Sequence, residues 1–319
     1  MKKNNTFLKV TAGIAIALVS FSCTNDDVTS ETPDNHKKAV SVVARIGDGD
    51  SQSDTRLTYE EGGIQPDGSA SMVVKWEKEE KIAIFHISGG KWLDDYAWSM
   101  DFDIMNSNAS DLSADRKSTV FKGEVTTGED NMIYCAIYPV PQELKSINVS
   151  GETTLYYIVD MAQTQDCNNP TAHLKEHDIL TCSGVYDFED IDFMHGLTVL
   201  RFDLTLPEAK EIKEIALSTS WEFFITSMQI RLEGGNSGPY PYPIESADKI
   251  TLPLLNAKAD NKVKAYMMVM GKSFEKDTPL TVTATAVDGT VYKKDFKAGI
   301  EGTLRYGKCY SIVKTLEKQ

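Results

Sequence analysis

Apolar and polar residues alternate with a period of two over much of this chain. Val40, Val42, Ala44 and Ile46 occupy every second position of one segment, and residues 281–287 (TVTATAV) repeat the pattern. Because successive side chains of a strand point to opposite faces of a sheet, this alternation is typical of strands with one buried face. No long segment has the spacing of an amphipathic helix. The sequence therefore predicts an all-β protein.

The candidate strands are short and are separated by Gly, Pro, Asn and Asp. Many short strands at this spacing favour β-sandwiches over a parallel α/β sheet. Asp288-Gly289 stands between two strand patterns, and both residues tolerate positive φ, so we expect a hairpin with a type I′ turn. Three prolines in residues 234–243 predict an irregular loop there and exclude a central strand.

The first 22 residues have the features of a signal peptide that ends at a cysteine. Three lysines precede an apolar run over residues 10–19, which is too short to span a bilayer. Ser22 supplies the small residue that lipoprotein signal peptidase needs before a cysteine. We therefore predict a lipoprotein signal peptide over residues 1–22 and a lipidated, palmitate-carrying Cys23, which would anchor the mature chain in a membrane. An ordinary secretory signal with an incidental cysteine is the alternative.

The rest of the chain is expected to hold a tether and two domains. Residues 23–38 are polar and predict a flexible tether. Asp26 and Asp27 within it resemble a signal that exports lipoproteins to the outer leaflet of the outer membrane. An acidic, turn-like stretch near residue 190 precedes a new apolar strand, so we expect an N-terminal β-sandwich domain over 39–190 and a C-terminal one over 191–319.

Charge and cysteine usage exclude several classes of protein. The net charge is −14, and without the first 22 residues it is near −17, from 30 basic and 47 acidic residues. Nucleic acids and anionic lipid surfaces need basic partners, so neither is expected. After Cys23 there is no Cys-x-x-Cys pair, which predicts isolated thiols, with a single disulfide as the alternative. These four cysteines are Cys135, Cys167, Cys182 and Cys309.

No catalytic, metal or cofactor site is predicted, so we do not expect an enzyme. His173 and His177 match an H-x-x-E-H pattern, but the segment is too short for the helix that such a zinc site uses, so we expect two loop histidines. Residues 48–54 alternate like a calcium loop, but Ser53 and Tyr59 replace the required Gly and Glu. Nucleophile-elbow, P-loop and dinucleotide motifs do not occur in the sequence.

Aromatic residues provide the remaining candidate binding site. Trp92, Tyr96 and Trp98 cluster in one segment and would stack on sugar rings or anchor a partner if exposed. A core cluster beneath a loop is the alternative, because aromatic side chains are usually buried. Trp76 and Trp221 lie beside strand patterns and are expected in the core.

Six segments occur in an order that resembles one known family. They are DTRLTY (54–59), VVKWEKEEKIAIF (73–85), IYCAIYP (133–139), HDILTCSG (177–184), DFMHGLTVLRFDL (192–204) and YGKCYSIVKTL (306–316). Over nearly the whole mature chain the sequence resembles the fimbrillin family, the subunits of type V pili. The resemblance implies a surface lipoprotein with two tandem transthyretin-like β-sandwich domains.

The resemblance also implies a route of assembly. In pilin members a surface protease cuts after an arginine near the first strand, and a strand of a neighbouring subunit fills the groove that is left. Arg45 and Arg56 are the candidate processing sites, and an uncut chain that keeps its first strand is the third possibility. A sandwich without that strand exposes unpaired backbone groups and an apolar slot, and an incoming strand would satisfy both.

The expected function is that of a structural or adhesive subunit of a type V-like fimbria, as shaft, tip or accessory protein. Its expected partners are other subunits or copies of itself through strand donation, outer-membrane lipid through Cys23, and a host protein or glycan. The last strand, CYSIVKTL (309–316), is a possible donor, with an ordinary terminal strand as the alternative. A monomeric surface lipoprotein that binds glycans is the alternative function.

Overall fold

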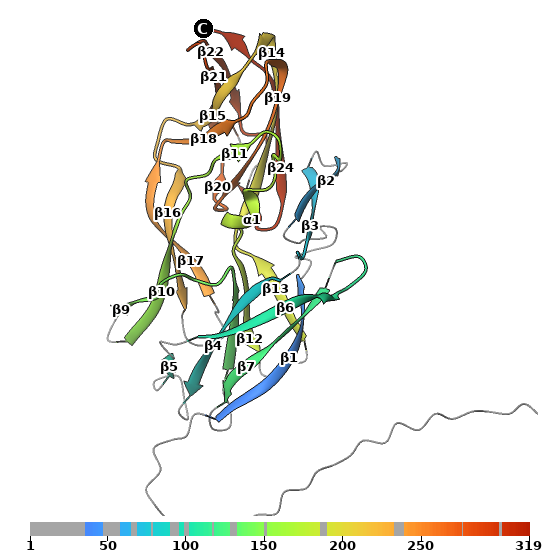
Figure 1. Ribbon diagram of the computed structural model, residues 1–319. Coiled ribbons are helices and arrows are strands. Elements are labelled where there is room, and N and C mark those ends of the chain that lie inside the picture. The colour runs from blue at the N-terminus through green and yellow to red at the C-terminus, as the bar shows by residue number, and fades with distance from the viewer. Residues whose placement is uncertain are drawn as a thin grey trace, which may run out of the picture. The chain divides into compact units, whose positions relative to one another are not determined.

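The computed structural model describes residues 36–46, 58–64, 69–77, 79–89, 96–98, 102–116, 118–127, 133–149, 152–185, 190–232, 239–275, 277–299 and 302–319 (Figure 1). Nearly all of them lie in strands or in the connections between strands, so the all-β prediction is confirmed. The one helix in this part of the chain is α1 (Leu174–His177). At four residues it is far shorter than a membrane crossing requires, so the described residues include no helix that could span a membrane.

The first sheet closes on itself and is called the ring here. Its strands follow the order β5 (Tyr96–Trp98), β4 (Lys81–Gly89), β6 (Asp103–Leu112), β7 (Ser118–Thr127), β1 (His36–Ile46), β13 (Asp190–His195), β12 (Leu180–Val185) and β8 (Ile133–Tyr138). β8 pairs back onto β4, where Ala83 has Ile104 of β6 on one side and Ile137 of β8 on the other. All strands except β5 therefore belong to a closed cycle.

The core of the ring receives buried side chains from every strand of that cycle. Trp76 is fully buried, and its indole packs edge-on against three aromatic side chains. Its centroid lies 5.2 Å from Phe121, 5.9 Å from Tyr138 and 6.0 Å from Phe193. Edge-to-face pairs of this kind stabilise a core beyond the area they bury, so Trp76 ties together strands far apart in sequence.

Two further sheets, built mostly of strands from the C-terminal half, form a sandwich that is called the C-terminal sandwich here. The six-stranded sheet has the order β11 (Gln165–Asp166), β18 (Lys249–Leu255), β15 (Ile212–Ser218), β21 (Pro279–Ala286), β22 (Val291–Lys297) and β25 (Glu317–Lys318). The five-stranded sheet has the order β19 (Asp260–Val269), β14 (Thr198–Lys210), β24 (Cys309–Thr315), β3 (Ser69–Lys75) and β2 (Thr58–Ile64). Side chains from both sheets form one core, and β20 (Ser273–Phe274) and β23 (Gly302–Thr303) pair in a separate two-stranded ribbon.

A four-stranded sheet combines strands from both halves of the sequence. Its order is β17 (Pro239–Ala247), β16 (Phe224–Leu232), β10 (Glu152–Asp160) and β9 (Lys145–Val149). β3 likewise pairs with β24, and β13 lies parallel to β1 in the ring. Strand pairing thus crosses residue 190, and the division into domains 39–190 and 191–319 stays a prediction. β1 begins at His36, inside the segment expected to be a tether.

The hairpin predicted around Asp288-Gly289 is confirmed, but the predicted type I′ turn is wrong. β21 and β22 pair up to Thr285 and Val291, and the N–H of Ala286 donates to the carbonyl of Thr290 at 2.8 Å. A type I′ turn needs positive φ at both central residues, whereas only Gly289 has it, at 87°. One glycine is sufficient because the loop is longer than the predicted turn, and the N–H of Gly289 donates back to Ala286 at 3.0 Å.

The segment 239–243 is a strand and not the irregular loop that its prolines predicted. It forms the start of β17 and pairs with β16, with Pro241 opposite Ile230. β17 lies at the edge of its sheet, where a missing N–H on the outer side breaks no ladder, so the exclusion of a central strand holds.

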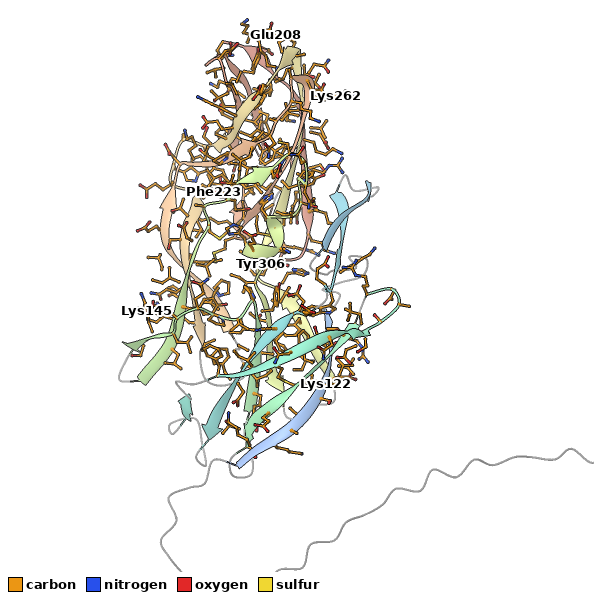
Figure 2. All side chains as sticks on the ribbon, in the orientation of Figure 1. Lys122, Lys145, Glu208, Phe223, Lys262 and Tyr306 are labelled. Carbon is orange, nitrogen blue, oxygen red and sulfur yellow. The ribbon has the colours of Figure 1, made fainter. Side chains whose placement is uncertain are left out.

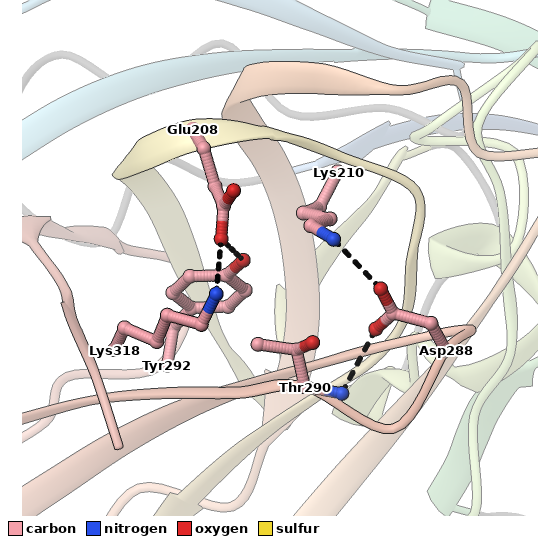
Figure 3. A network of polar contacts seen from close by, with 6 residues as sticks. All are labelled: Glu208, Lys210, Asp288, Thr290, Tyr292 and Lys318. Carbon is pink, nitrogen blue, oxygen red and sulfur yellow. Dashed lines mark hydrogen bonds and ion pairs between the residues drawn. The ribbon is translucent and has the colours of Figure 1, made fainter.

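The last described strand, β25, joins the six-stranded sheet next to a network of polar contacts (Figure 3). β25 pairs with β22, and the Glu208 carboxylate accepts hydrogen bonds from the Tyr292 hydroxyl and from Lys318 Nζ, both at 2.8 Å. Lys210 Nζ lies 2.7 Å from Asp288, and that hydrogen bond is the main reason why the pKa of the Asp288 carboxyl is well below its usual value. The last residues thus cover the edge of β22.

The cysteines and one tryptophan test further predictions. Among the described residues no disulfide joins Cys135, Cys167, Cys182 and Cys309, as the isolated-thiol prediction expected. Trp221 was expected in the core, but its side chain is 43% exposed and packs edge-on against Phe223. It follows β15 in a connection, so no second sheet covers it.

The two tryptophans make a matched test of the ring core. Trp76→Ala should lower the free energy of unfolding by about 3–5 kcal/mol, because it leaves a large cavity among packed rings. Trp221→Ala should lower it by less than about 1 kcal/mol, because that side chain is largely exposed. Urea unfolding followed by circular dichroism measures both. Similar losses for the two variants would contradict the assignment of Trp76 to the core.

Candidate assembly site

β1 is held in the ring by two neighbours. It pairs antiparallel with β7 from His36 to Arg45 and parallel with β13 from Val43 to Ile46 (Figure 1). It comes first in the described part of the chain, so no described element precedes it. The loss of β1 would therefore leave a gap in the closed sheet between β7 and β13.

The inward face of β1 carries the side chains that the alternation predicted to be buried. Val42 and Ala44 are fully buried in the ring core, and Val40 packs against the same core, whereas Ser41 and Arg45 are exposed. Complete burial of a valine contributes about 1.5–3 kcal/mol. The gap left by β1 would therefore be an apolar slot as well as a pair of open strand edges.

An ion pair lies near each end of β1. Lys37 Nζ lies 3.3 Å from Asp103, and a guanidinium nitrogen of Arg45 lies 3.1 Å from Asp190. At least one partner of each pair is more than half exposed, so each pair contributes about 1 kcal/mol or less. Backbone pairing and the buried face, and not these charges, hold β1 in place.

Arg45 lies in this site, and the other predicted site residues do not. Its backbone is paired on both sides, opposite Ser118 and Asp192. Tyr96 and Trp98 lie in β5, which extends the sheet on β4. Cys23, Arg56 and Trp92 lie outside the described residues.

The histidine pair expected in a loop lies in and next to the single helical turn α1. His173 Nε2 donates to the carbonyl of Tyr266 at 3.0 Å, and burial lowers the pKa of His173 to about 4 and lowers that of His177. Among the described residues no group of three or more metal-ligating side chains occurs. His195, at the end of β13, has its Nδ1 2.8 Å from a carboxylate oxygen of Asp178, which follows α1, and both side chains are buried.

Side chains that the sequence analysis did not single out seal the outer edge of β19. Gln163 accepts from the N–H of Met268 at 2.7 Å and donates to its carbonyl at 2.6 Å. Gln165 accepts from the N–H of Tyr266 at 2.9 Å and donates to the carbonyl of Lys264 at 3.1 Å. The two buried side-chain amides thus make hydrogen bonds to the backbone of β19 that a neighbouring strand would otherwise make. Their alternation in MAQTQ was the available signal, since glutamines at inward positions of an extended segment need partners.

Comparison with known proteins establishes the fold. No family model matches the chain, and no curated protein matches it. A candidate cell adhesion protein from Bacteroides uniformis ATCC 8492 aligns with a TM-score of 0.51 at 15% identity, over 88% of this chain and 95% of that one. Another from Bacteroides ovatus ATCC 8483 aligns with a TM-score of 0.52 at 11% identity, over 89% and 96%. At these identities the likeness is one of fold.

This chain is an all-β protein that shares its architecture with the two Bacteroides structures, as the resemblance to the fimbrillin family predicted. The tip fimbrial protein Mfa3 from Porphyromonas gingivalis, with a C-terminal truncation, also aligns over 89% of this chain and 98% of that one at 10% identity. Its TM-score of 0.38 is too low to establish a shared fold.

The glutamine seal can be tested by removing one amide. Gln165→Leu leaves the buried N–H of Tyr266 without its acceptor, and an unsatisfied buried group costs about 1–3 kcal/mol of folding free energy. Gln142→Leu, at an exposed position, is the control and should leave stability within about 0.5 kcal/mol. Equal unfolding midpoints for both variants and the wild type would refute the sealing role.

Stability should fall with acid because of His173. Its folded pKa of about 4 lies below its ordinary value of 6.5, so between these values the unfolded chain binds more protons and stability decreases as the pH falls. His173→Gln keeps an N–H donor for the Tyr266 carbonyl but cannot titrate. Its melting temperature should drop less than that of the wild type between pH 7 and pH 4. An identical drop would show that His173 does not titrate in this window.

Proposed function

We propose that this chain is a structural or adhesive subunit of a surface fimbria, lipid-anchored through Cys23 and assembled by strand exchange at the position of β1. One observation carries the proposal. β1 is the first described strand, it has a neighbour on each edge, and it buries Val42 and Ala44 in the ring core. A partner strand that replaced it would make the same backbone pairs and fill the same slot.

The resemblance of the sequence to fimbrillins and the fold shared with two candidate adhesion proteins support this role. The proposed location is the outer face of the outer membrane, with the fimbria as the destination after processing. The proposed partners are other fimbrial subunits and a host protein or glycan. The role is one of joining and holding, without a catalytic step.

Of the two candidate processing sites, we favour Arg56. A protease must bind several residues in an extended, unpaired form, and the backbone at Arg45 is engaged with Ser118 and Asp192. Cleavage at Arg45 would require β1 to leave the ring first. Cleavage after Arg56 would also sever β1 from the rest of the chain.

A neighbouring subunit would supply the donor strand. β24, the candidate donor within the chain, pairs with β14 from Cys309 to Thr315 in this structure, as expected for an ordinary terminal strand. A donor suited to the ring would need small apolar residues where Val42 and Ala44 stand. It would gain from cations near Asp103 and Asp190, which pair with Lys37 and Arg45 now.

Limited digestion with trypsin tests the proposal. Trimmed protein should form a ladder of oligomers on native gels, and Arg56→Gln, but not Arg45→Gln, should slow the trimming. A synthetic peptide of residues 36–46 should keep the trimmed protein monomeric, because it refills the slot. The matched control is the same peptide with aspartate in place of Val42 and Ala44, which should have no effect. Trimmed protein that stays monomeric and loses no stability would rule out strand exchange at β1.

A further inference from the structure

We propose that the C-terminal sandwich contains a second strand-accepting site, the seam along the outer edge of β24, and that it takes an extended peptide with alternating apolar residues and acidic ends. The seam is separate from the ring. It adds a second junction to the proposed assembly role, and it is tested with β1 in place, so the two proposals can fail separately.

The first observation is an open strand edge. The carbonyl of Lys308 accepts from β14 at 2.9 Å, and the N–H of Leu316 donates to β14 at 2.8 Å. Because backbone groups alternate in direction along a strand, the even-numbered residues of β24 face β14 and the odd-numbered ones face the opposite edge. On that edge β3 pairs only with Cys309 and Tyr310, and no other described strand pairs beyond them. Within the described part of the chain, Ser311, Val313 and Thr315 are the residues of β24 whose outward backbone groups have no strand partner.

The second observation is a cavity of about 460 Å³ along this edge. It opens between the two sheets of the sandwich and reaches their common core. Apolar side chains make most of its lining, namely Leu200, Leu217, Phe274, Leu280, Phe296 and Ile312. An unpaired edge beside an apolar cavity is what strand addition uses, with backbone bonds for affinity and a pocket for alternate side chains.

The third observation is the charge of the seam. Lys297 and Lys314 line it together with the apolar residues, and none of the described residues that line it is acidic. Lys314 Nζ lies 4.7 Å from the centroid of the Phe296 ring, and Lys297 has one exposed partner, Asp277, at 3.5 Å. In a chain of net charge −14 this is a local reversal of sign. It selects acidic ends on the incoming strand and disfavours β1 itself, which carries Lys37, Lys38 and Arg45.

Several other described sheet edges are protected, whereas this stretch of β24 has no described strand beside it. β19, at the far edge of the same sheet, is sealed by Gln163 and Gln165. β17 carries three prolines, and β22 is covered in part by β25. Proteins usually protect exposed edges in such ways because an open edge pairs with other chains. Among the described edges, β24 combines exposed backbone groups with an apolar slot.

Peptide binding to the intact chain tests the proposal. The probes are fluorescent forms of Ac-DVTVTVTVD-NH2 and Ac-KVTVTVTVK-NH2, measured by anisotropy. The acidic probe should bind more tightly. Lys314→Glu should weaken the acidic probe about fivefold and strengthen the basic one. The control Lys262→Glu, on β19 (labelled in Figure 2), should change neither. If Lys314→Glu changes the affinity of neither probe, the proposal is wrong.

Amide hydrogen exchange identifies the mode of binding. The acidic probe should slow exchange at Ser311, Val313 and Thr315, because their N–H groups gain acceptors. Val313→Pro removes one of these donors while leaving the bonds to β14, so it should abolish binding in a folded variant; Lys314→Glu remains decisive if that variant does not fold. Palmitate is the competing probe. Binding of palmitate without protection of these amides, or peptide protection elsewhere, would show an apolar ligand cavity or another site and refute strand addition.

Discussion

Each β-strand carries hydrogen-bonding groups along both edges, and the architecture of this protein depends on how those edges are satisfied. A buried backbone group without a partner costs free energy comparable to a lost hydrogen bond, so every buried edge must be paired, and proteins commonly close or cover their exposed edges. The ring does so by closure, through the double pairing of β4. β19 does so with glutamine amides, and β17 with prolines.

This constraint connects the fold to the proposed function. A closed ring is stable because every strand in it has a partner on both edges. A strand that is removed can be replaced by another strand with the same alternation of apolar and polar residues. β1 is suited to this role because its side chains alternate between the core and solvent and because its ion pairs are exposed and weak. The seam at β24 presents the opposite case, an edge left open beside an apolar cavity with a cationic lining.

Local pattern was reliable wherever burial follows from neighbouring residues. The alternation around Val42 correctly predicted its buried face, and Trp76 lies in the core as expected. The pattern failed where distant segments decide the outcome. The proline segment after residue 238 is a strand because β16 offers it an edge, and Trp221 is exposed because no sheet covers it. The MAQTQ alternation signals inward glutamines, but it could not identify the edge of β19 as their partner, because that strand lies about a hundred residues away.

The sequence by itself determined that this protein is made of strands, because side-chain alternation is a local property that a sheet of any topology must obey. It also determined the acidic character of the chain and the candidate anchor at Cys23. Only the tertiary structure decided which strand lies beside which, that the ring closes through β8 and β4, and that β24 keeps an open edge. Those outcomes depend on pairing between residues far apart in the chain, and a period of two is the same for every possible neighbour.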